Sequence, residues 1–273
     1  MTATTARILV IGAHPDDCEV QCGGAAALWR KKGFTVRFVS ATNGGTGHHE
    51  IGGIELVNRR IAEAAASAGV IGVESQVLPI PNGGIEPNLT YRSMFIRLIR
   101  EFAPDLILTH RPNDYHPDHR YTSQLVQDSS YVVTVPNNCP ETPHLQYNPT
   151  VMYLCDSFKK PYPFQGDVVI SIDDVAEAKV DMLHRHTSQM YEWLPYNKGT
   201  LDQVPSGDDE RRKWLFDQRM PRNEEIANRF RAELVARYGE QKGAAVKYAE
   251  AFEKCEYGGA LDEEKEALLF GGL

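Results

Sequence analysis

Apolar and polar positions in the first half of the chain switch several times between a two-residue period and a helical one. Short apolar runs rich in β-formers predict buried strands; they cover residues 7–12, 35–41, 75–80 and 104–110. The segments after them carry apolar residues at helical spacing and predict helices; they cover residues 19–33, 54–69, 89–103 and 119–133. The first half therefore predicts four strand–helix repeats.

The order of these elements predicts the fold class. Alternating strands and helices imply parallel strands joined by right-handed crossovers, with helices on both faces of one sheet. We therefore expect an α/β protein with a Rossmann-like, open, mainly parallel sheet flanked by helices. Ligands of such sheets bind beyond the carboxyl ends of the strands, so the loops after the strands are the place to look for chemistry.

The second half of the chain is less regular. Strand patterns cover residues 151–157 and 167–172. A helix is predicted over residues 173–194, with Asp173 or Asp174 as its N-cap.

Charged residues are frequent in the remaining segment. Two patterns rich in Glu, Lys and Arg predict helices over residues 222–239 and 243–259. The sequence contains no internal repeat and no low-complexity tract. We expect one domain over residues 1–273, with a motif-bearing core at about 7–191 and a helical C-terminal extension at about 192–273.

Composition narrows the class of protein. Hydrophobic residues make up 42% of the 273 positions, which is enough for a sizeable core. The formal net charge is −8 and no basic run occurs, which argues against a broad nucleic-acid-binding surface. No apolar run approaches the roughly 20 residues that cross a bilayer, and the N-terminus lacks a signal-peptide pattern. We therefore expect a cytoplasmic protein without a membrane span.

The five cysteines predict reduced thiols and not a disulfide framework, because they are odd in number, scattered and without a C-x-x-C pair. Cys18 and Cys22 lie four residues apart on the first predicted helix. Free cysteines of this kind usually pack as small apolar residues, and we expect the same here.

The first of two short motifs, "HPDD", follows the first predicted strand directly. His14 and Asp17 are three residues apart on a strand-to-helix turn, so their side chains lie on one face and can reach one ion. Pro15 fixes φ between them and suits the start of a helix. Asp16 is expected to point elsewhere and to hold a water instead of the metal.

The loop after the fourth strand repeats this arrangement with His116, Asp118 and His119. Both motifs end parallel strands, so we expect them to meet at one edge of the sheet. Nitrogen and carboxylate ligands suit a divalent transition metal, with zinc as the leading candidate. Three protein ligands leave a position open for water, which is the pattern of catalytic zinc sites.

A purely structural role is the alternative for each motif taken alone. An aspartate of "HPDD" can cap the following helix while His14 is a polar surface residue. Two such motifs at strand ends favour a shared metal site instead. For His110 a place behind the site and a place in the core stay open, and exposed or packed positions are expected for His48, His49, His144, His184 and His186.

The glycine-rich segment "TNGGTG" (residues 42–47) does not predict a nucleotide site. It lacks the Gly-Lys-Ser/Thr ending of a P-loop, and it follows the second strand, whereas a dinucleotide fingerprint follows the first. An acidic "HPDD" after the first strand would repel a pyrophosphate. We expect these glycines to let the backbone approach a substrate or a neighbouring loop.

Four motifs in this order, "GAHPDD", "RRIAEAAASAG", "PDLILTHRPNDYHPDH" and "HTSQM", resemble those of the LmbE-like (PIG-L) family of zinc-dependent N-deacetylases. That family includes N-acetylglucosaminyl-phosphatidylinositol, N-acetylglucosaminyl-inositol and bacillithiol-pathway deacetylases. The resemblance covers roughly residues 7–191, and the ordered set is specific although each motif is short.

The resemblance implies roles for the residues that match it. Asp16 is similar to the general base of the family, and His116 to the group that stabilises the oxyanion or protonates the leaving amine. The metal ligands, for one zinc ion per chain, would be His14, Asp17 and His119.

Further positions are implied to support these groups. Asp118 would orient His116, and Arg60 of "RRIAE" would contact the substrate. We take Tyr115, next to His116, as a second candidate substrate contact. Family members are often oligomeric, which makes a hexamer, trimer or dimer the expected assembly.

Together these inferences predict a hydrolase that removes an acetyl group from an N-acetylglucosamine-type conjugate, using metal-activated water and an aspartate base. The expected partner is a small N-acetylated amino sugar conjugate. Two alternatives stay open: a zinc amidase acting on another acyl amide, and a catalytically inactive homologue that binds sugar or metal.

Overall fold

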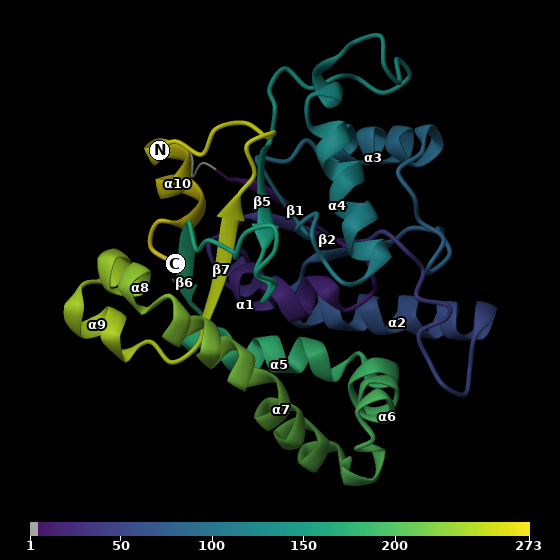
Figure 1. Cartoon of the computed structure of the whole chain (residues 1–273), viewed down its shortest axis with the longest axis vertical. Coiled ribbons are helices and arrows are strands. Elements are labelled where there is room, and N and C mark those ends of the chain that lie inside the picture. The colour runs from purple at the N-terminus through teal and green to yellow at the C-terminus, as the bar shows by residue number, and fades with distance from the viewer. Residues whose placement is uncertain (1–4) are drawn as a thin grey trace.

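The computed structural model describes residues 5–273 and shows one seven-stranded sheet with helices on both faces (Figure 1). The strands are β1 (Arg7–Gly12), β2 (Thr35–Ser40), β3 (Glu74–Val77), β4 (Leu106–Thr109), β5 (Thr150–Leu154), β6 (Val168–Ser171) and β7 (Ala249–Lys254). Their order in the sheet is β3-β2-β1-β4-β5-β7-β6. Neighbours among the first five strands are parallel, whereas β7 is antiparallel to β5 and β6. The predicted mainly parallel α/β sheet is confirmed.

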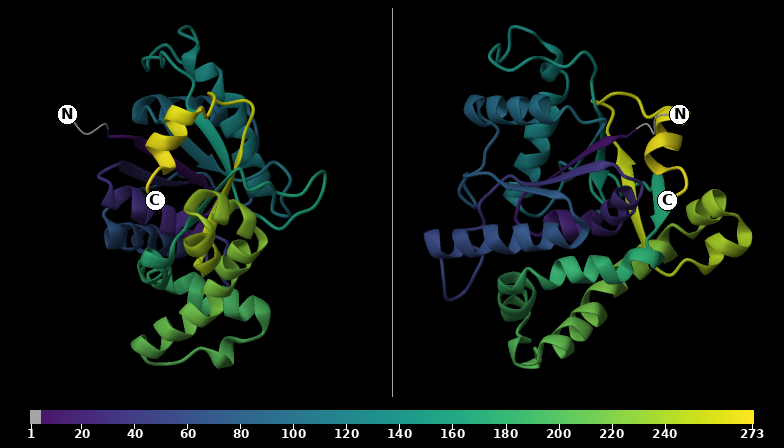
Figure 2. Two further views of the ribbon diagram at one scale, coloured as in Figure 1. Left: turned by 90° about the vertical axis from the view of Figure 1, so that its left-hand side faces the viewer. Right: turned by 180° about the vertical axis from the view of Figure 1, so that it is seen from behind.

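Helices α1, α2, α5 and α10 cover one face of the sheet and α3 and α4 cover the other (Figure 2). The helices are α1 (Asp17–Lys31), α2 (Gly53–Ile71), α3 (Leu89–Phe102), α4 (Pro117–Ser130), α5 (Ala176–His184), α6 (Leu194–Lys198), α7 (Asp208–Arg229), α8 (Arg231–Tyr238), α9 (Glu240–Ala245) and α10 (Glu263–Phe270). A π-helical segment, Ser188–Trp193, joins the α5 region to α6. No helix of the described chain has the length and apolar character that crossing a membrane requires.

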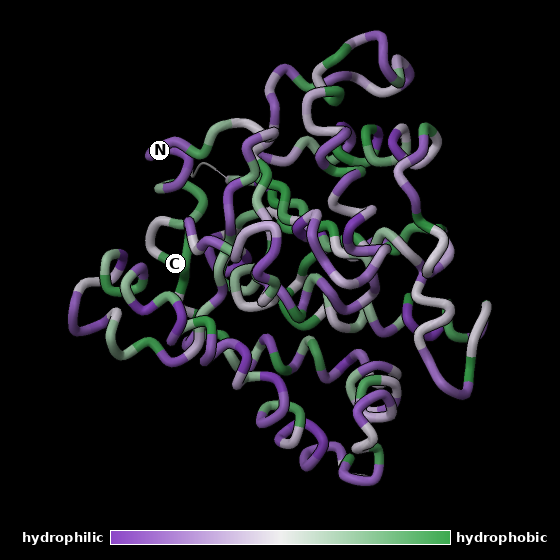
Figure 3. Tube along the Cα trace, in the orientation of Figure 1, coloured by the Kyte–Doolittle hydropathy of each residue, from purple (hydrophilic) through white to green (hydrophobic). Residues whose placement is uncertain are grey.

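Strand β1 is buried on both faces because its side chains alternate between two apolar cores. Ile8 and Val10 pack with the helices of one face, and Leu9 and Ile11 pack with those of the other. All four residues are apolar, as expected of a parallel strand covered by helices on both sides. Figure 3 shows the hydrophobic colour concentrated in the central strands and a largely hydrophilic α7.

The sheet reverses its strand order between β1 and β4. From β1 the chain moves outward to β2 and β3, and then returns to place β4 on the other side of β1. The loops after β1 and β4 therefore lie next to each other at the carboxyl ends of the strands. This is the switch point at which open α/β sheets bind ligands.

Helix α1 is interrupted at Cys22, whose backbone is not helical (φ −144°, ψ 25°). The carboxylate of Glu250, on β7, accepts the N–H groups of Gly24 (2.9 Å) and Ala25 (2.7 Å), and so caps the second part of the helix. Lys179 of α5 donates to the same carboxylate at 2.6 Å. Cys18 and Cys22 are buried and unpaired, as predicted.

Strand β7 replaces part of the helix predicted over residues 243–259, so that prediction is wrong. Glu250 and Glu253 are buried in the strand, where Lys179 and Arg111 lie within ion-pair distance of them. Their charges gave the segment the polar pattern of an exposed helix. The prediction that Asp173 or Asp174 caps the helix is also wrong, because neither side chain makes a cap hydrogen bond. The Asp173 carboxylate instead accepts the N–H groups of residues 247–248, which lead into β7.

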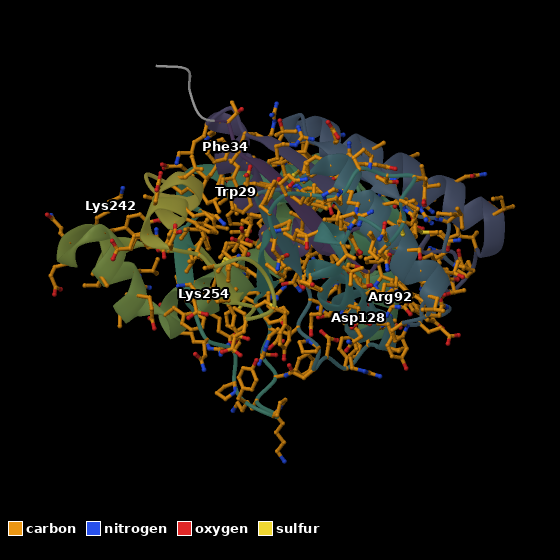
Figure 4. All side chains as sticks on the ribbon, turned by 90° about the horizontal axis from the view of Figure 1, so that it is seen from above. Trp29, Phe34, Arg92, Asp128, Lys242 and Lys254 are labelled. Carbon is orange, nitrogen blue, oxygen red and sulfur yellow. The ribbon has the colours of Figure 1, made fainter. Side chains whose placement is uncertain are left out.

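Helix α10 closes the sheet against α1. The Trp29 indole donates a 2.7 Å hydrogen bond to the Leu269 carbonyl, and its ring packs on Phe252 and Phe270. Figure 4 shows Trp29 among the packed side chains, with Lys242 of α9 at the periphery. The last part of the chain is thus built into the same core as its first strand.

Candidate active site

The turn from β1 into α1 brings His14 and Asp17 together, as their spacing predicts. Asp17 is the first residue of α1, and its Oδ2 accepts the N–H groups of Ala13 (3.0 Å) and His14 (2.8 Å). A Cβ on Gly12 would lie 2.7 Å from the Cβ of Asp17, so only glycine leaves room for this fold-back. The turn therefore fixes the carboxylate at the end of β1.

Three donor atoms from the two predicted motifs converge at this point. His119 Nε2 lies 3.3 Å from His14 Nδ1 and 3.6 Å from Asp17 Oδ2, and the last two atoms are 3.4 Å apart. Zinc bonds of about 2.0–2.1 Å in tetrahedral geometry place ligand atoms roughly 3.3 Å apart. The donor set and its spacing fit a divalent metal. Overlapping groups of similar spacing also include His110 and His116.

Electrostatics at these ligands reflect their close pairing. Burial opposes a charge on His14, but hydrogen bonds with Asp118 and Asp17 outweigh it and raise the pKa of His14 to about 9. Burial favours the neutral form of Asp17, yet the imidazoles of His119 and His110 hold its pKa well below the usual range. The cluster thus favours positive charge on the imidazole rings around the Asp17 carboxylate. A bound cation would supply this positive charge instead.

Asp114 orients His119 and was not found by sequence reasoning. Its Oδ1 lies 3.1 Å from His119 Nδ1 and accepts the backbone N–H of His116 at 2.8 Å. A carboxylate behind a histidine ligand fixes the ring and raises its basicity. The available signal was its position two residues before His116, in the same loop.

His110 lies behind the ligands. Its ring stacks on that of His119, with centroids 4.1 Å apart and planes 7° apart. Its Nε2 accepts the N–H of Ala13 at 3.0 Å and lies 3.3 Å from Asp17 Oδ2. Burial and the neighbouring His119 lower the pKa of His110. The sequence left two places open for His110, one behind the site and one in the core, and the structure places it behind the site.

Asp118 makes a different contact from the one that the resemblance implied. Its Oδ2 lies 3.1 Å from His14 Nε2 and accepts the N–H of Gly83 at 2.8 Å. The carboxylate therefore orients His14. His116 is held instead through its Nδ1, which accepts the backbone N–H of Asp118 at 3.1 Å.

Asp16 has a strained backbone, with φ at 149° and ψ at −20°. The carboxylate lies beside Arg60, whose Nη2 is 3.2 Å from Oδ1. Burial raises the pKa of Asp16, although the Arg60 guanidinium opposes the rise. A carboxyl group with increased proton affinity beside a metal-type donor set is suited to acid–base chemistry.

Arg60 is 2% exposed and also donates to the Pro15 carbonyl at 2.7 Å. A Cβ on Gly44, whose φ is +69°, would lie 2.6 Å from Arg60 Nη1. The glycines of residues 42–47 therefore let a loop pass close to this side chain, in agreement with the expected close approach of a neighbouring loop.

A cavity of about 340 Å³ opens above the cluster. Its lining comes from the segments that follow β1, β2, β3 and β4, from α2 and from the segment before α6. It includes His14, Asp16, Asp17, Arg60, Asn82, Tyr115, His116, His119, Gln189 and Trp193. Gln189 donates to the Gly47 carbonyl at 2.9 Å and so ties the two sides together. Neither Gln189 nor Trp193 was predicted as a site residue, although Gln189 lies in the motif "HTSQM".

His116 and Tyr115 form one rim of this cavity. The His116 ring meets that of His14 edge-on, with centroids 4.6 Å apart. Burial and the neighbouring imidazoles of His14 and His119 lower the pKa of His116. Tyr115 is 74% exposed, and its ring lies edge-on to both His116 and His119. Both residues line the cavity.

The remaining histidines have structural partners. The His48 side chain is 2% exposed and pairs with Glu192 at 2.8 Å, so the expectation of an exposed position is wrong. His49 stacks on His48. His184 and His186 are buried, as the packing prediction requires. In the described chain none of these four lines the cavity.

The fold and this donor set together define an α/β protein whose switch point carries a group of side chains that could hold a divalent metal. The family model described as PIG-L, GlcNAc-PI de-N-acetylase, matches residues 9–130. Residues 9–130 therefore match the PIG-L (LmbE-like) family that the sequence motifs resemble.

Individual relatives agree with this assignment. The diacetylchitobiose deacetylase of Thermococcus kodakarensis is 28% identical over 202 residues, which cover 70% of this chain and 74% of that protein. A 1D-myo-inositol 2-acetamido-2-deoxy-alpha-D-glucopyranoside deacetylase of Rhodococcus erythropolis is 26% identical over 152 residues, which cover 44% of this chain and 51% of that protein.

Solved structures share the fold. The N,N'-diacetylchitobiose deacetylase of Pyrococcus horikoshii superposes with a TM-score of 0.70 at 22% identity, covering 93% of this chain and 85% of that chain. GalB of Pseudomonas putida, a 4-carboxy-2-hydroxymuconate hydratase, has a TM-score of 0.71 at 17% identity, covering 91% and 95%. Because a hydratase has the same fold, the reaction must be argued from the site.

Proposed function

We propose that this protein is a zinc-dependent N-deacetylase that hydrolyses the acetamide of an N-acetylglucosamine-type conjugate. The observation that carries the proposal is the convergence of His14, Asp17 and His119 within 3.6 Å of one another, with Asp16 beside them. The names of the relatives, which include deacetylases of diacetylchitobiose and of an inositol-linked acetamido sugar, support the substrate class. The homo-oligomer and the cytoplasmic location stay predictions from the sequence.

The proposed metal ligands are His14, Asp17 and His119, with Asp114 and Asp118 fixing the two imidazole rings. Zinc bound in such a site supplies Lewis-acid polarisation of a carbonyl and lowers the pKa of water to about 7. Two nitrogen donors and one carboxylate match the catalytic pattern of this metal.

Asp16 is the proposed general base. Its carboxylate lines the cavity, and Arg60 holds it in place without itself being exposed. Because burial raises the proton affinity of Asp16, the side chain can accept a proton from the attacking water and return it to the leaving nitrogen. Arg60 is thus proposed to position Asp16, in addition to any contact with the substrate.

His116 is the proposed hydrogen-bond donor to the carbonyl oxygen. Its Nδ1 accepts the backbone N–H of Asp118, so in the neutral ring the proton is on Nε2. A neutral donor aimed at the cavity stabilises negative charge as it develops on the oxygen. This tautomer leaves Asp16 as the group that protonates the amine.

The test is acetate release from a panel of N-acetylglucosamine glycosides, with mass spectrometry of the products. We expect one acetyl group to be lost from at least one glycoside, activity to disappear on chelation, and added zinc to restore it. N-acetyl amino acids and N-acetylated simple amines form the comparison set. Turnover of that set alone would replace the proposal with a different amidase, and zinc-loaded protein without any turnover would favour a binding homologue.

A further inference from the structure

Two cavities meet at the metal-type cluster, and Tyr115 and His119 line both of them. The first, of about 340 Å³, also contains Asp16 and His116, the proposed base and hydrogen-bond donor. The second, of about 390 Å³, has walls from the segment after β5 and from helix α7, and its lining within the described chain includes neither of these two groups. A sugar ring carried by the nitrogen of the reacting acetamide is therefore closest to the walls of the first cavity.

Trp193 has the largest apolar side chain in the first cavity. The apolar side chains of its lining, among the described residues, are Tyr115, Trp193 and Leu194. Polar side chains such as Thr46 and Asn82 form another part of the wall. A pyranose ring has hydroxyl groups along its edge and C–H groups on its faces, so a flat aromatic surface suits the faces and polar groups suit the edge. Trp193 is partly exposed and offers such a surface.

The indole is supported by a column of stacked rings. The planes of the Trp193 and Tyr196 rings are 19° apart and their centroids 6.0 Å apart. The Tyr196 ring stacks on His49, with centroids 4.1 Å and planes 9° apart, and His49 stacks on His48, with centroids 4.6 Å apart. Rings packed in this way restrict one another's orientation, so the indole is presented to a ligand with little freedom to rotate.

Hydrogen bonds fix the far end of this column. His48 Nδ1 accepts the N–H groups of Glu50 (3.1 Å) and Ile51 (3.3 Å). In the neutral ring the proton is therefore on Nε2, which donates to Glu192 at 2.8 Å. Glu192 directly precedes Trp193 and also accepts from Arg59 of α2 at 2.8 Å. The loop after β2 is thus joined to the segment that carries the indole.

Glu63 of α2 holds the start of the same π-helical segment. Its carboxylate accepts the backbone N–H of Ser188 and the hydroxyl of Thr187, both at 2.8 Å. The segment places Gln189 and Trp193 in the first cavity. Turns of π-helix are uncommon and occur frequently at functional sites, so this one is a reason to look for a ligand contact here.

We infer that Trp193 is a specificity-determining contact: its indole packs on the C–H face of the N-acetylated sugar ring, and the column of stacked rings positions it. The inference rests on the proposed deacetylase function, because that function places the acetamide at the neighbouring cluster. It names an acetamide carried by a pyranose ring as the substrate, in preference to an open-chain acetamide. Trp193 lies beyond residue 130, where the family match ends.

The first experiment measures kcat and KM for the methyl glycoside of N-acetylglucosamine. Trp193→Leu keeps an apolar side chain but removes the flat surface. We expect KM to rise about three- to tenfold while kcat stays within about twofold of wild type, and Trp193→Phe to restore part of the loss. N-acetylethanolamine has the same acetamide without a ring, and its kcat/KM should be equally low in wild type and Trp193→Leu. An unchanged KM for the glycoside, or an equal fall in kcat/KM on both substrates, would overturn the inference.

Phe158→Leu is the matched control, because it removes an aromatic ring of the second cavity in the same way. It should change KM for the methyl glycoside by less than about twofold. Tyr196→Leu removes the ring that supports the indole and should raise KM in the same direction as Trp193→Leu, whereas Tyr196→Phe keeps the ring and should restore KM. A rise in KM for Phe158→Leu without one for Trp193→Leu would place the sugar in the second cavity and overturn the inference.

A binding measurement separates this inference from the proposed reaction. Titration calorimetry of the Asp16→Asn protein with the methyl glycoside of N-acetylglucosamine needs no turnover. We expect binding, and a Kd about three- to tenfold higher when Trp193→Leu is added. This result, in a protein whose wild type releases acetate from no glycoside, would reject the deacetylase proposal and keep the sugar contact. Equal affinity with and without Trp193→Leu, or no binding by either protein, would reject the contact.

Discussion

The two halves of this chain use charged residues in opposite ways. The polar side chains of the first half come just after strands β1 and β4 and not within them. His14, Asp17 and His119 therefore reach the cavity at the carboxyl ends of the strands. In β7 the charges lie within the strand, where Glu250 and Glu253 are buried and bind groups of other elements. A polar residue at the end of a core strand indicates chemistry here, whereas one inside a core strand indicates a link between elements.

This difference assigns separate tasks to the two halves. The loops of the first half supply the donor set and the proposed base. The second half completes the sheet with β7, caps the interrupted α1 through Glu250, and supplies the wall formed by α7. Changes at strand ends should therefore alter activity at constant stability, and changes inside β7 should do the reverse.

The largest effect on the activity side is expected from Asp16→Asn. Asparagine keeps the size of the side chain and an oxygen that can accept from Arg60, but it cannot take a proton from water. We expect kcat to fall by about 10²–10⁴-fold, with zinc content and thermal midpoint close to wild type. Steady-state acetate release, metal analysis and calorimetry check the three quantities.

The exposed Asp174→Asn variant is the matched control and should keep full activity. An Asp16→Asn protein with wild-type kcat would remove Asp16 from the role of base. Loss of zinc in that variant would mean that Asp16 is a ligand, in disagreement with its orientation toward Arg60.

The sequence predicted the first half well because local pattern and global topology agree there. The central strands β1 and β4 are mostly apolar and buried, and helix α3 is amphipathic with Asn88 as its N-cap. The spacing of His14 and Asp17, with His119 just after the neighbouring strand β4, was sufficient to predict that these three side chains lie together. Parallel topology brings such loops together whatever lies between them in the sequence.

What the sequence could not predict depends on partners far along the chain. Asp114 differs from any loop aspartate only by its contact with His119. Asp118, in the first turn of α4, contacts His14, which lies 104 residues away in the sequence. The burial of Glu250 depends on Lys179 and on the break in α1, which no local pattern shows. Pairing of this kind reverses the usual inference that a run of charges is a solvated surface.

Glu250→Ala tests the structural side of the comparison. The change leaves the Lys179 ammonium buried without its partner and removes the acceptor for Gly24 and Ala25. Breaking a buried ion pair from one side costs about 3–5 kcal/mol of unfolding free energy. Urea unfolding should show this loss, while kcat of the folded fraction at low temperature should stay near wild type.

Glu256→Ala, at an exposed position just beyond β7, is the control and should change the unfolding free energy by less than about 0.5 kcal/mol. Were Glu250→Ala no more destabilising than this control, the carboxylate would not hold α1 and α5 together. A large fall in kcat at unchanged stability would instead make β7 part of the catalytic machinery.

The smallest of the three effects is expected from Asp114→Asn, and it falls between the two categories. Asp114 is in a loop of the first half, yet it reaches the proposed metal only through the His119 ring. Its amide replacement keeps a hydrogen-bond acceptor but removes the negative charge that makes the imidazole a stronger ligand. We expect zinc affinity to fall by about 10–100-fold, measured by competition with a chromophoric chelator. Under saturating zinc the variant should recover most of its kcat, because the proposed base and the hydrogen-bond donor are intact. Zinc affinity within twofold of wild type would show that His119 needs no carboxylate behind it. A kcat that stays low under saturating zinc would show that Asp114 also positions His116, by accepting the backbone N–H of His116.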